Sequence, residues 1–454
     1  MMKRIEQVDP DWAWEPFLAT AETPWDMGAA AHLMRRAGFG ATGEELRQLV
    51  ARDPEDVVAE LVAAQQPESF QREMASLVRA SLASGGPQRL AAQWIYRMLN
   101  TPAPLLEKMT LFWHGHFATS AAKVEDSKLM QQQNELLREH ALGDFSQLAL
   151  EISRDPAMLL YLDSATNRKA HPNENYAREI MELFCLGEGN YTEQDIRELA
   201  RCFTGWEIKR EKFRINRYQE DTGEKTVLGR TGKLNGEDGV AIVVSQYQTA
   251  RFITRKLVRF LVLDEPRAPD GLIEPLADKL REDDMRIAPT VQRILGSNLF
   301  FSMLVRGRKV RSPVEVAIGF LRSLNGSTDA FRLATTLQQL GQGLYFPPSV
   351  KGWDGGRTWI NSSTLLGRSN LIRNLLGDDK TRFGKQGLEQ HFTSQGAQSM
   401  GEVVAYLETV LFAVPLPDTA RQKIAQLADS PAAKENRLRD AVHLLCTIPE
   451  FQLS

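Results

Sequence analysis

Helical periodicity is the feature that most constrains the fold of this chain. Apolar residues recur at three- and four-residue intervals through most of the sequence, which is the spacing of one face of an amphipathic helix. Capping signals support the pattern, because Glu45 stands three residues after Thr42 at a predicted helix start. The helices predicted after this one cover about 89–101, 104–116, 125–142, 144–153, 173–186, 193–204, 247–263, 273–282, 287–296, 312–324, 330–341, 400–412 and 417–449.

One region departs from helical periodicity: WEIKREKFRINRYQEDTGEKTVLGRTGKLNG, residues 206–236. Its β-branched and aromatic residues are separated by Asp-Thr-Gly, Gly-Arg-Thr-Gly and Asn-Gly turn signals. We therefore predict a mainly α fold, a large irregular helical bundle with a small β-hairpin excursion around residues 206–236. Because the composition becomes more polar from about residue 376, we predict a main helical domain over 1–375 and a linker with a packed C-terminal helical cap over 376–454.

Two further segments have a clear local interpretation. In FPPSVKGWDGGRTWINSS, Trp353 and Trp359 lie among prolines and glycines, which predicts an ordered loop whose tryptophans pack on other residues. In KVRSPVE, Ser312 and Pro313 predict the start of a helix.

Composition excludes several broad classes. The chain has 454 residues, 43% of them hydrophobic, so it can bury a large core. It has 58 acidic and 55 basic residues, and this near balance gives no large positive potential that would attract nucleic acid. Three scattered cysteines indicate small core residues and neither a disulfide framework nor a zinc cluster. No window approaches the roughly 18 apolar residues of a membrane span, and no apolar signal-peptide run is visible, which favours a cytoplasmic location. Walker, GxSxG, HExxH and CxxC motifs are absent.

The segment NENYAREIMELF, residues 173–184, gives the predicted 173–186 helix a strongly polar face. This face holds Glu174, Asn175, Arg178, Glu179 and Glu182, with Asn173 placed to cap the helix. Arg178 stands four residues from both Glu174 and Glu182, the spacing of an i,i+4 ion-pair ladder on a solvated surface. The asparagines and the tightly capped helix that follows favour the alternative, a fixed polar surface that positions a ligand or metal.

Two smaller clusters also carry metal-ligating residue types. In FWHGHF, His114 and His116 point about 200° apart on a helix, so they share one ion only if that helix ends near Gly115. Apolar-flanked histidines are more often core residues, and a metal or acid–base role is the alternative. In QEDTGEK, Glu220 and Asp221 offer hard oxygen ligands or ordinary turn chemistry.

Several motifs together, in this order, resemble the bacterial family catalogued as domain of unknown function 1800. They are HLMRRAGFG, FWHGHFATS, LDSATNRKAHPNENYAREIMELFCLGEGNYTEQDIRELARCFTGW, GEKTVLG, ARFITRKLVRFLV, VRSPVE and PPSVKGW, and they span roughly residues 28–450. The family is known by its motifs and not by an activity. Its members often look exported, and their genes often lie beside a second uncharacterised, sulfatase-like family, which implies export and a protein partner encoded by a neighbouring gene.

The resemblance gives weight to individual positions. The matching motif residues are Trp113, His114, His116, Asp163, Asn167, Asn173, Glu174, Asn175, Arg178, Glu179, Glu182, Thr204, Gly205, Trp206 and Lys225. Family members commonly have a His-Asp pair where this chain has Glu220-Asp221, and a histidine often found just before the ARFITRKL helix is missing here. Glutamate can replace histidine as a ligand but not as a base near neutral pH.

We predict that the 173–186 helix, FWHGHF and the β-excursion converge on one polar cleft of a metal-assisted hydrolase or group-transfer enzyme. The predicted catalytic residues are His114, His116, Glu174, Glu179 and Glu182. The predicted ligands of a divalent metal, which would activate water or polarise a substrate oxygen, are His114, His116, Glu179 and Asp221. The predicted binding residues are Trp113, Asp163, Asn167, Asn173, Asn175, Arg178, Trp206 and Lys225. The alternative is a non-catalytic scaffold or partner of the neighbouring-gene protein, in which the Arg–Glu ladder is buried and fixes helix packing.

Overall fold

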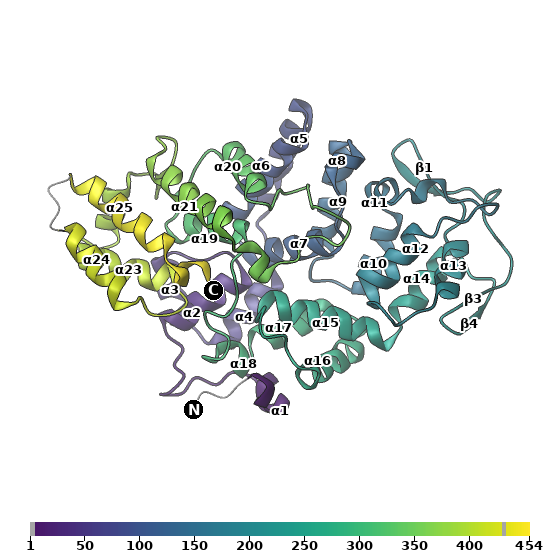
Figure 1. The fold of residues 1–454 in the computed structure, drawn as a ribbon, viewed down its shortest axis with the longest axis horizontal. Helices are drawn as coiled ribbons and strands as arrows, with labels where there is room; N and C mark the ends of the chain where they lie inside the picture. The colour runs from purple at the N-terminus through teal and green to yellow at the C-terminus, as the bar shows by residue number, and fades with distance from the viewer. Residues whose placement is uncertain (1–4, 429–432) are drawn as a thin grey trace.

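The computed structural model describes residues 5–428 and 433–454, and its fold is mainly α-helical, as predicted (Figure 1). The α-helices are α1 (Pro10–Trp14), α2 (Met27–Ala37), α3 (Gly43–Val50), α4 (Pro54–Ala63), α5 (Glu68–Ser84), α6 (Pro87–Asn100), α7 (Pro104–His116), α8 (Ala121–Val124), α9 (Ser127–Glu139), α10 (Phe145–Arg154), α11 (Pro156–Tyr161), α12 (Asn175–Glu179), α13 (Glu193–Cys202), α14 (Gly236–Val244), α15 (Tyr247–Leu261), α16 (Asp270–Glu282), α17 (Ile287–Leu295), α18 (Asn298–Phe301), α19 (Pro313–Ser323), α20 (Ala330–Gln339), α21 (Ser362–Gly377), α22 (Leu388–Ser394), α23 (Met400–Leu411), α24 (Asp418–Ala428) and α25 (Lys434–Thr447).

Local sequence signals set most helix starts. The capping box predicted from Thr42 and Glu45 is present at α3, and a second one at α19 joins Ser312 and Glu315. The single helix predicted over 417–449 is wrong: α24 and α25 are separate helices there, and residues 429–432 of that prediction lie outside the described residues.

The predicted β-excursion is confirmed as two antiparallel hairpins. Strands β1 (Trp206–Lys209) and β2 (Lys212–Ile215) form one, with Trp206 opposite Ile215, and β3 (Lys225–Val227) and β4 (Arg230–Gly232) form the other. A third small pair, β5 (Gly326–Ser327) with β6 (Arg382–Phe383), was not predicted, because strands of two residues leave no periodic signal.

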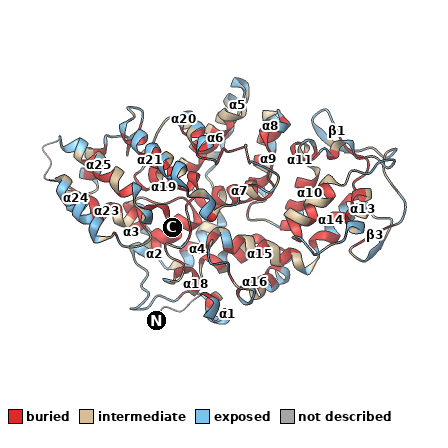
Figure 2. Ribbon diagram, viewed as in Figure 1, coloured by how far each residue is buried: buried red, intermediate tan, exposed pale blue. Residues whose placement is uncertain are grey.

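Helices α2 and α7, in the middle of the molecule, are among those that contribute to both hydrophobic clusters of the core. In Figure 1 the C-terminal helices α23 to α25 lie on the left and α10 to α14 on the right, with α2 and α7 between them. On α7, Phe112 and Trp113 belong to the cluster shared with α10 to α17, whereas Leu111 belongs to the cluster shared with α19 to α25. Figure 2 shows buried positions on the sides where helices face one another. The C-terminal end of α7 is therefore packed between the two hydrophobic clusters.

The C-terminal segment packs on the rest of the chain. Leu453 bridges to Val310, and the Arg311 amide donates to the Gln452 carbonyl at 2.8 Å. Helix α21 extends across the boundary predicted at residue 375, and the division into a domain and a cap stays a prediction. Among the described helices, none combines the length and apolar character that a membrane crossing requires.

Candidate active site

The two histidines of FWHGHF lie on one helix and have separate partners. Helix α7 continues to His116, so the two imidazoles leave it on different sides. His114 Nε2 accepts a hydrogen bond from the Tyr345 amide at 3.1 Å, and its ring contacts Trp94 and Trp353. Burial lowers the pKa of His114 to about 4, so this imidazole is a neutral part of the core at neutral pH.

His116 is also buried, but it faces the polypeptide that follows α12. Here α12 continues as a π-helix, η3 (Ile180–Cys185), instead of the single α-helix predicted over 173–186. The wider turn bonds the Leu186 amide to the Met181 carbonyl at 2.8 Å and leaves later carbonyls without helical partners. His116 Nε2 donates to one of these, Phe184 O, at 3.0 Å, which leaves Nδ1 as an acceptor.

Lys256 of α15 completes the pair. Its Nζ donates to His116 Nδ1 at 3.0 Å and to the Leu183 carbonyl at 3.1 Å, and it lies 4.6 Å from the centre of the Phe252 ring. Burial, opposed by the nearby Cys185 thiol, lowers the pKa of Lys256 to about 7, and the charges of Arg259 and Lys351 act in the same direction as burial. Burial and the Lys256 charge likewise hold the pKa of His116 well below its ordinary value.

The Lys256–His116 pair lines a cleft of about 210 Å³ between α7, α15, the start of α19 and the loop before α21. Aromatic rings form much of its wall, namely those of Phe112, Phe260, Trp353 and Trp359. The charged side chains of the wall are Lys256, Arg259, Lys309 and Lys351 with Asp264, Glu315 and Asp354. The cleft thus joins four of the sequence motifs that are far apart in the chain.

Most charges in this wall are paired. Lys309 Nζ lies 3.8 Å from Asp264 and 3.9 Å from Glu315, and Lys351 lies 2.9 Å from Asp354. The buried Lys108 forms a close ion pair with Glu315, and these cations hold the pKa of Glu315 far below its usual range despite burial. Glu315 therefore serves as a fixed structural anion.

Two cations of the cleft are exceptions. Within residues 5–428 and 433–454, neither Lys256 nor Arg259 forms an ion pair with a carboxylate; Arg259 Nη2 instead donates to the Asp354 backbone carbonyl at 2.5 Å. The two residues are three apart on α15, so they lie on one side of the helix about one turn apart. The cleft therefore has positive charge that an anionic ligand can neutralise.

The loop between Phe346 and Ile360 closes the cleft because one glycine permits close backbone contact. A Cβ atom on Gly352, whose φ is +78°, would stand 2.1 Å from the Gly115 carbonyl oxygen of α7. This contact places Trp353 against His114 and lets its indole N–H donate to Gly341 O at 2.8 Å. The packing predicted for Trp353 is confirmed.

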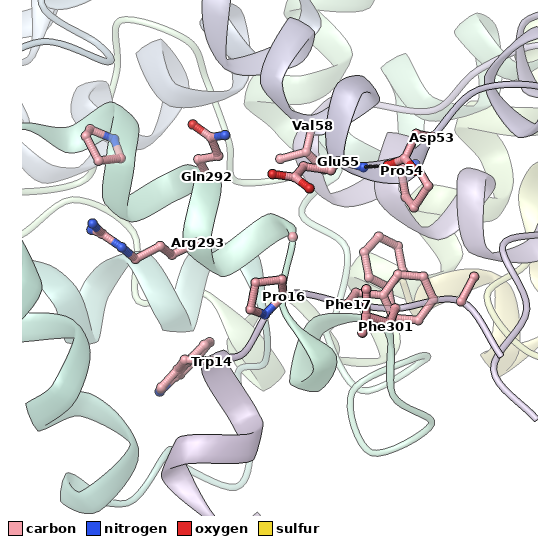
Figure 3. A pocket seen from close by; sticks show the side chains of 14 residues that line it. Trp14, Pro16, Phe17, Asp53, Pro54, Glu55, Val58, Gln292, Arg293 and Phe301 are labelled. Carbon is pink, nitrogen blue, oxygen red and sulfur yellow. Dashed lines mark hydrogen bonds between the residues drawn. The ribbon is translucent and has the colours of Figure 1, made fainter.

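A larger pocket of about 580 Å³ lies elsewhere, between the N-terminal segment, α4, α17 and α18 (Figure 3). Its wall is mostly apolar, including Trp14, Phe17 and Phe301. Two of its polar side chains have partners: Asp53 caps α4 by accepting from the Glu55 amide at 2.8 Å, and Arg293 pairs with Asp283. Among the described residues, no lysine or histidine lines this pocket, so we place the candidate site in the smaller cleft, where the two meet.

The predicted polar face of 173–186 lies outside the cleft wall. Arg178 donates two hydrogen bonds to Glu193 of α13, at 2.8 and 2.9 Å, and a longer one of 3.4 Å to Glu174. Glu182 accepts from the Tyr191 hydroxyl at 2.7 Å. The Glu179 carboxylate makes no hydrogen bond or ion pair with another described residue, and burial followed by the Glu182 charge raises its pKa.

The predicted asparagines connect this helix to the turn before it. Asn173 Oδ1 accepts from the Asn175 amide, and its Nδ2 donates to the Asp163 carbonyl, both at 3.0 Å. Asn175 donates to Leu162 O, and the buried Asn167 donates to Ala200 O at 2.9 Å. These bonds satisfy backbone groups, which is a structural use of amide side chains.

The predicted residues of the β-excursion are satisfied locally. Arg201 Nε donates to Asp221 at 2.8 Å, and although burial opposes it, this bond and one from the Gly223 amide lower the pKa of Asp221. The buried Lys225 ammonium donates to the carbonyls of Asp221, Gly223 and Leu234 at 2.6, 3.1 and 2.8 Å. Trp206 packs in the core against Phe203. Trp113, on α7, is likewise a core residue, with its indole N–H on Ala141 O.

Of the predicted site residues, His116 lines the cleft, and its contact with Phe184 O links FWHGHF to the 173–186 segment. Across the part of the chain that the structure describes, no three or more His, Cys, Asp or Glu side chains form a group suited to a metal ion. The predicted ligands His114, His116, Glu179 and Asp221 instead lie in the separate surroundings described above.

Sequence reasoning missed Lys256, Arg259 and the cleft itself. A usable signal was present, because Lys256 stands four residues from both Phe252 and Phe260 and so interrupts an aromatic stripe of α15. The ammonium of a lysine within such a stripe either reaches solvent or is buried with polar partners. Its partner His116 is 140 residues away in the sequence, so the local pattern does not show which of the two applies.

The fold and the cleft define a mainly α-helical protein with an aromatic, basic pocket around a lysine–histidine pair. The model of one protein family, described as "Protein of unknown function (DUF1800)", matches residues 32–453, and the chain belongs to this family. The resemblance inferred from the motifs is thereby confirmed. No curated protein and no solved structure matches the chain.

Proposed function

We propose that this protein is an enzyme whose active site is the cleft at the end of α7, and that Lys256 transfers a proton to or from a small organic acid bound there. The proposal rests on one observation: the Lys256 amine lines a cleft, lies 3.0 Å from His116 Nδ1, and has no carboxylate partner among the described residues. A general acid–base group works best when its pKa lies near the working pH, and that of Lys256 is about 7.

Each neighbour has a distinct role in this proposal. His116 orients the amine through Nδ1, while its Nε2–H is fixed on Phe184 O. The Trp353 and Trp359 rings cover the apolar part of the substrate, and Arg259 offers an unpaired cation to its carboxylate. The predicted metal-assisted reaction is not required by this arrangement, and no grouping of ligands among the described residues supports it.

The proposal is tested by competitive acetylation of the folded protein with trace acetic anhydride between pH 5 and 11, followed by peptide mapping. We expect the reactivity of Lys256 to titrate near pH 7 and that of exposed lysines near about 10.4. Titration of Lys256 with the exposed group would overturn an acid–base role.

A second test asks whether the cleft binds ligands. A library of small carboxylic acids is screened by thermal shift against the wild-type protein, Lys256→Met, Trp353→Ala and the surface control Lys169→Met. We expect acids that stabilise the wild type and Lys169→Met but not the other two. Equal stabilisation of all four proteins would show that these acids bind elsewhere.

A further inference from the structure

The surroundings of Lys256 suit a second use of its amine. A neutral amine has two N–H bonds and one lone pair, and the two N–H bonds of Lys256 have acceptors in His116 Nδ1 and Leu183 O. The lone pair then occupies the remaining position on a nitrogen that lines the cleft. A ligand in the cleft therefore meets a nucleophile that is already oriented.

Arg259 indicates which charged group the ligand has. Its guanidinium lies one helical turn from Lys256, lines the cleft, and is held against the backbone of the loop: it donates to Asp354 O, and ideal Cβ positions on Gly355 and Gly356 lie 3.9 and 3.8 Å from Nη2. A guanidinium with free N–H groups in this position suits a carboxylate. The cleft volume of about 210 Å³ restricts the ligand to a small molecule.

We propose that Lys256 forms an imine with the carbonyl group of a small keto acid whose carboxylate pairs with Arg259. This inference rests on the proposed function, because it uses the same cleft and the same amine. It names the substrate class as a carbonyl compound and adds a covalent step.

The step balances without any further reagent. The Lys256 lone pair attacks the carbonyl carbon, a C–N bond forms, and the C=O π electrons move to oxygen. His116 Nδ1, the base 3.0 Å away, takes one N–H proton and passes it to this oxygen, which gives the neutral carbinolamine. The second N–H proton passes by the same base to the carbinolamine hydroxyl, which leaves as water while the nitrogen lone pair forms C=N. One carbonyl compound and one amine thus give one imine and one water.

Reductive trapping tests the proposal directly. The full-length protein is incubated at pH 7 with pyruvate and cyanoborohydride, which converts an imine to a stable secondary amine, and the modified lysines are located by peptide mass spectrometry. Because the pKa of Lys256 is about 7, about half of its amines are unprotonated at this pH, whereas fewer than about one in a thousand exposed lysines are. We expect labelling at Lys256 to exceed that of exposed lysines at least about tenfold, since lower basicity offsets part of this advantage.

Two variants and a neutral probe separate the parts of the proposal. Lys256→Met abolishes selective labelling, whereas the surface variant Lys169→Met keeps it. Arg259→Met lowers trapping of pyruvate about tenfold, because the carboxylate loses a charge-assisted partner, and leaves trapping of the uncharged probe propanal unchanged. Even if Lys256→Met fails to fold, the peptide map of the wild-type protein shows whether Lys256 is labelled in preference to exposed lysines.

The outcomes are distinct. Even labelling of all surface lysines would overturn the imine, and an equal effect of Arg259→Met on both probes would overturn the carboxylate contact. If pyruvate leaves Lys256 unmodified while Lys256-dependent binding of acids persists in the thermal-shift screen, the imine fails and the proton-transfer proposal stands. If both results are negative, both proposals fail.

Discussion

Two polar regions of this protein contain similar side chains in different surroundings. On the face formed by α12, α13 and the β-hairpins, cations meet carboxylates or backbone carbonyls, as Arg178 does with Glu193 and Lys225 with three carbonyls. In the cleft at the end of α7, the cation Lys256 meets a neutral imidazole and a single carbonyl. Many polar residues can thus satisfy one another as part of the structure, whereas a partly buried amine without a carboxylate partner is a candidate for reactivity.

The largest effect is expected from Lys225→Met. The substitution leaves three carbonyls around a buried site without their donor, and we expect the free energy of unfolding to fall by roughly 3–5 kcal/mol. Urea denaturation measures this loss, with the exposed Lys233→Met as control. A Lys225→Met protein as stable as the control would remove the distinction between the two regions, since the ammonium would then have no structural role.

Gly352→Ala probes the contact that closes the cleft. Its Cβ would stand 2.1 Å from Gly115 O at a φ of +78°, so we expect a loss of about 2–3 kcal/mol and a changed Trp353 fluorescence. The matched control is Gly341→Ala, where φ is +91° but no atom lies within 4 Å of the added Cβ. The control isolates backbone strain, for which about 1 kcal/mol is expected. Equal losses in both variants would show that the loop does not depend on the Gly352–Gly115 contact.

The stability difference between the wild type and Lys256→Met is expected to depend on pH. The folded protein lowers the pKa of Lys256 to about 7, so above that pH the unfolded chain binds more protons at this residue than the folded chain does. The wild type therefore gains stability relative to Lys256→Met as pH rises from 6 to 9, by about 1–2 kcal/mol after allowance for partial exposure. Urea denaturation at both pH values measures the difference, with the surface variant Lys169→Met as control. A pH-independent difference would mean that Lys256 titrates normally.

The smallest effect is expected from Arg178→Ala. The Arg178 side chain is 36% exposed and that of Glu193 62%, so their ion pair is screened by water. By urea denaturation we expect a loss of about 0.5–1 kcal/mol for Arg178→Ala, and Glu193→Gln should also lower stability because it removes the same ion pair. The scaffold alternative predicts unfolding on loss of Arg178, and a loss above about 3 kcal/mol would support it.

The candidate site was only partly predictable. FWHGHF was identified as a functional candidate, and His116 does line the cleft, but no sequence pattern distinguishes His116 from His114. Both are buried and apolar-flanked, and they differ only in what other segments bring to them: a Tyr345 amide to one and the Lys256 amine to the other. The π-helix was also unpredictable, because the same residues give α-helical periodicity.

Local sequence signals predicted most of the helices, several of their caps and the two hairpins of the β-excursion, because periodicity, capping residues and turn signals act over a few neighbouring residues. The bounds of α7, predicted at 104–116, are those observed. Which polar groups remain without an ion partner depends instead on how the folded segments pack. That outcome depends on contacts between segments such as His116 and Lys256, or Gly115 and Gly352, and burial sets the pKa of a side chain only after those segments have packed together.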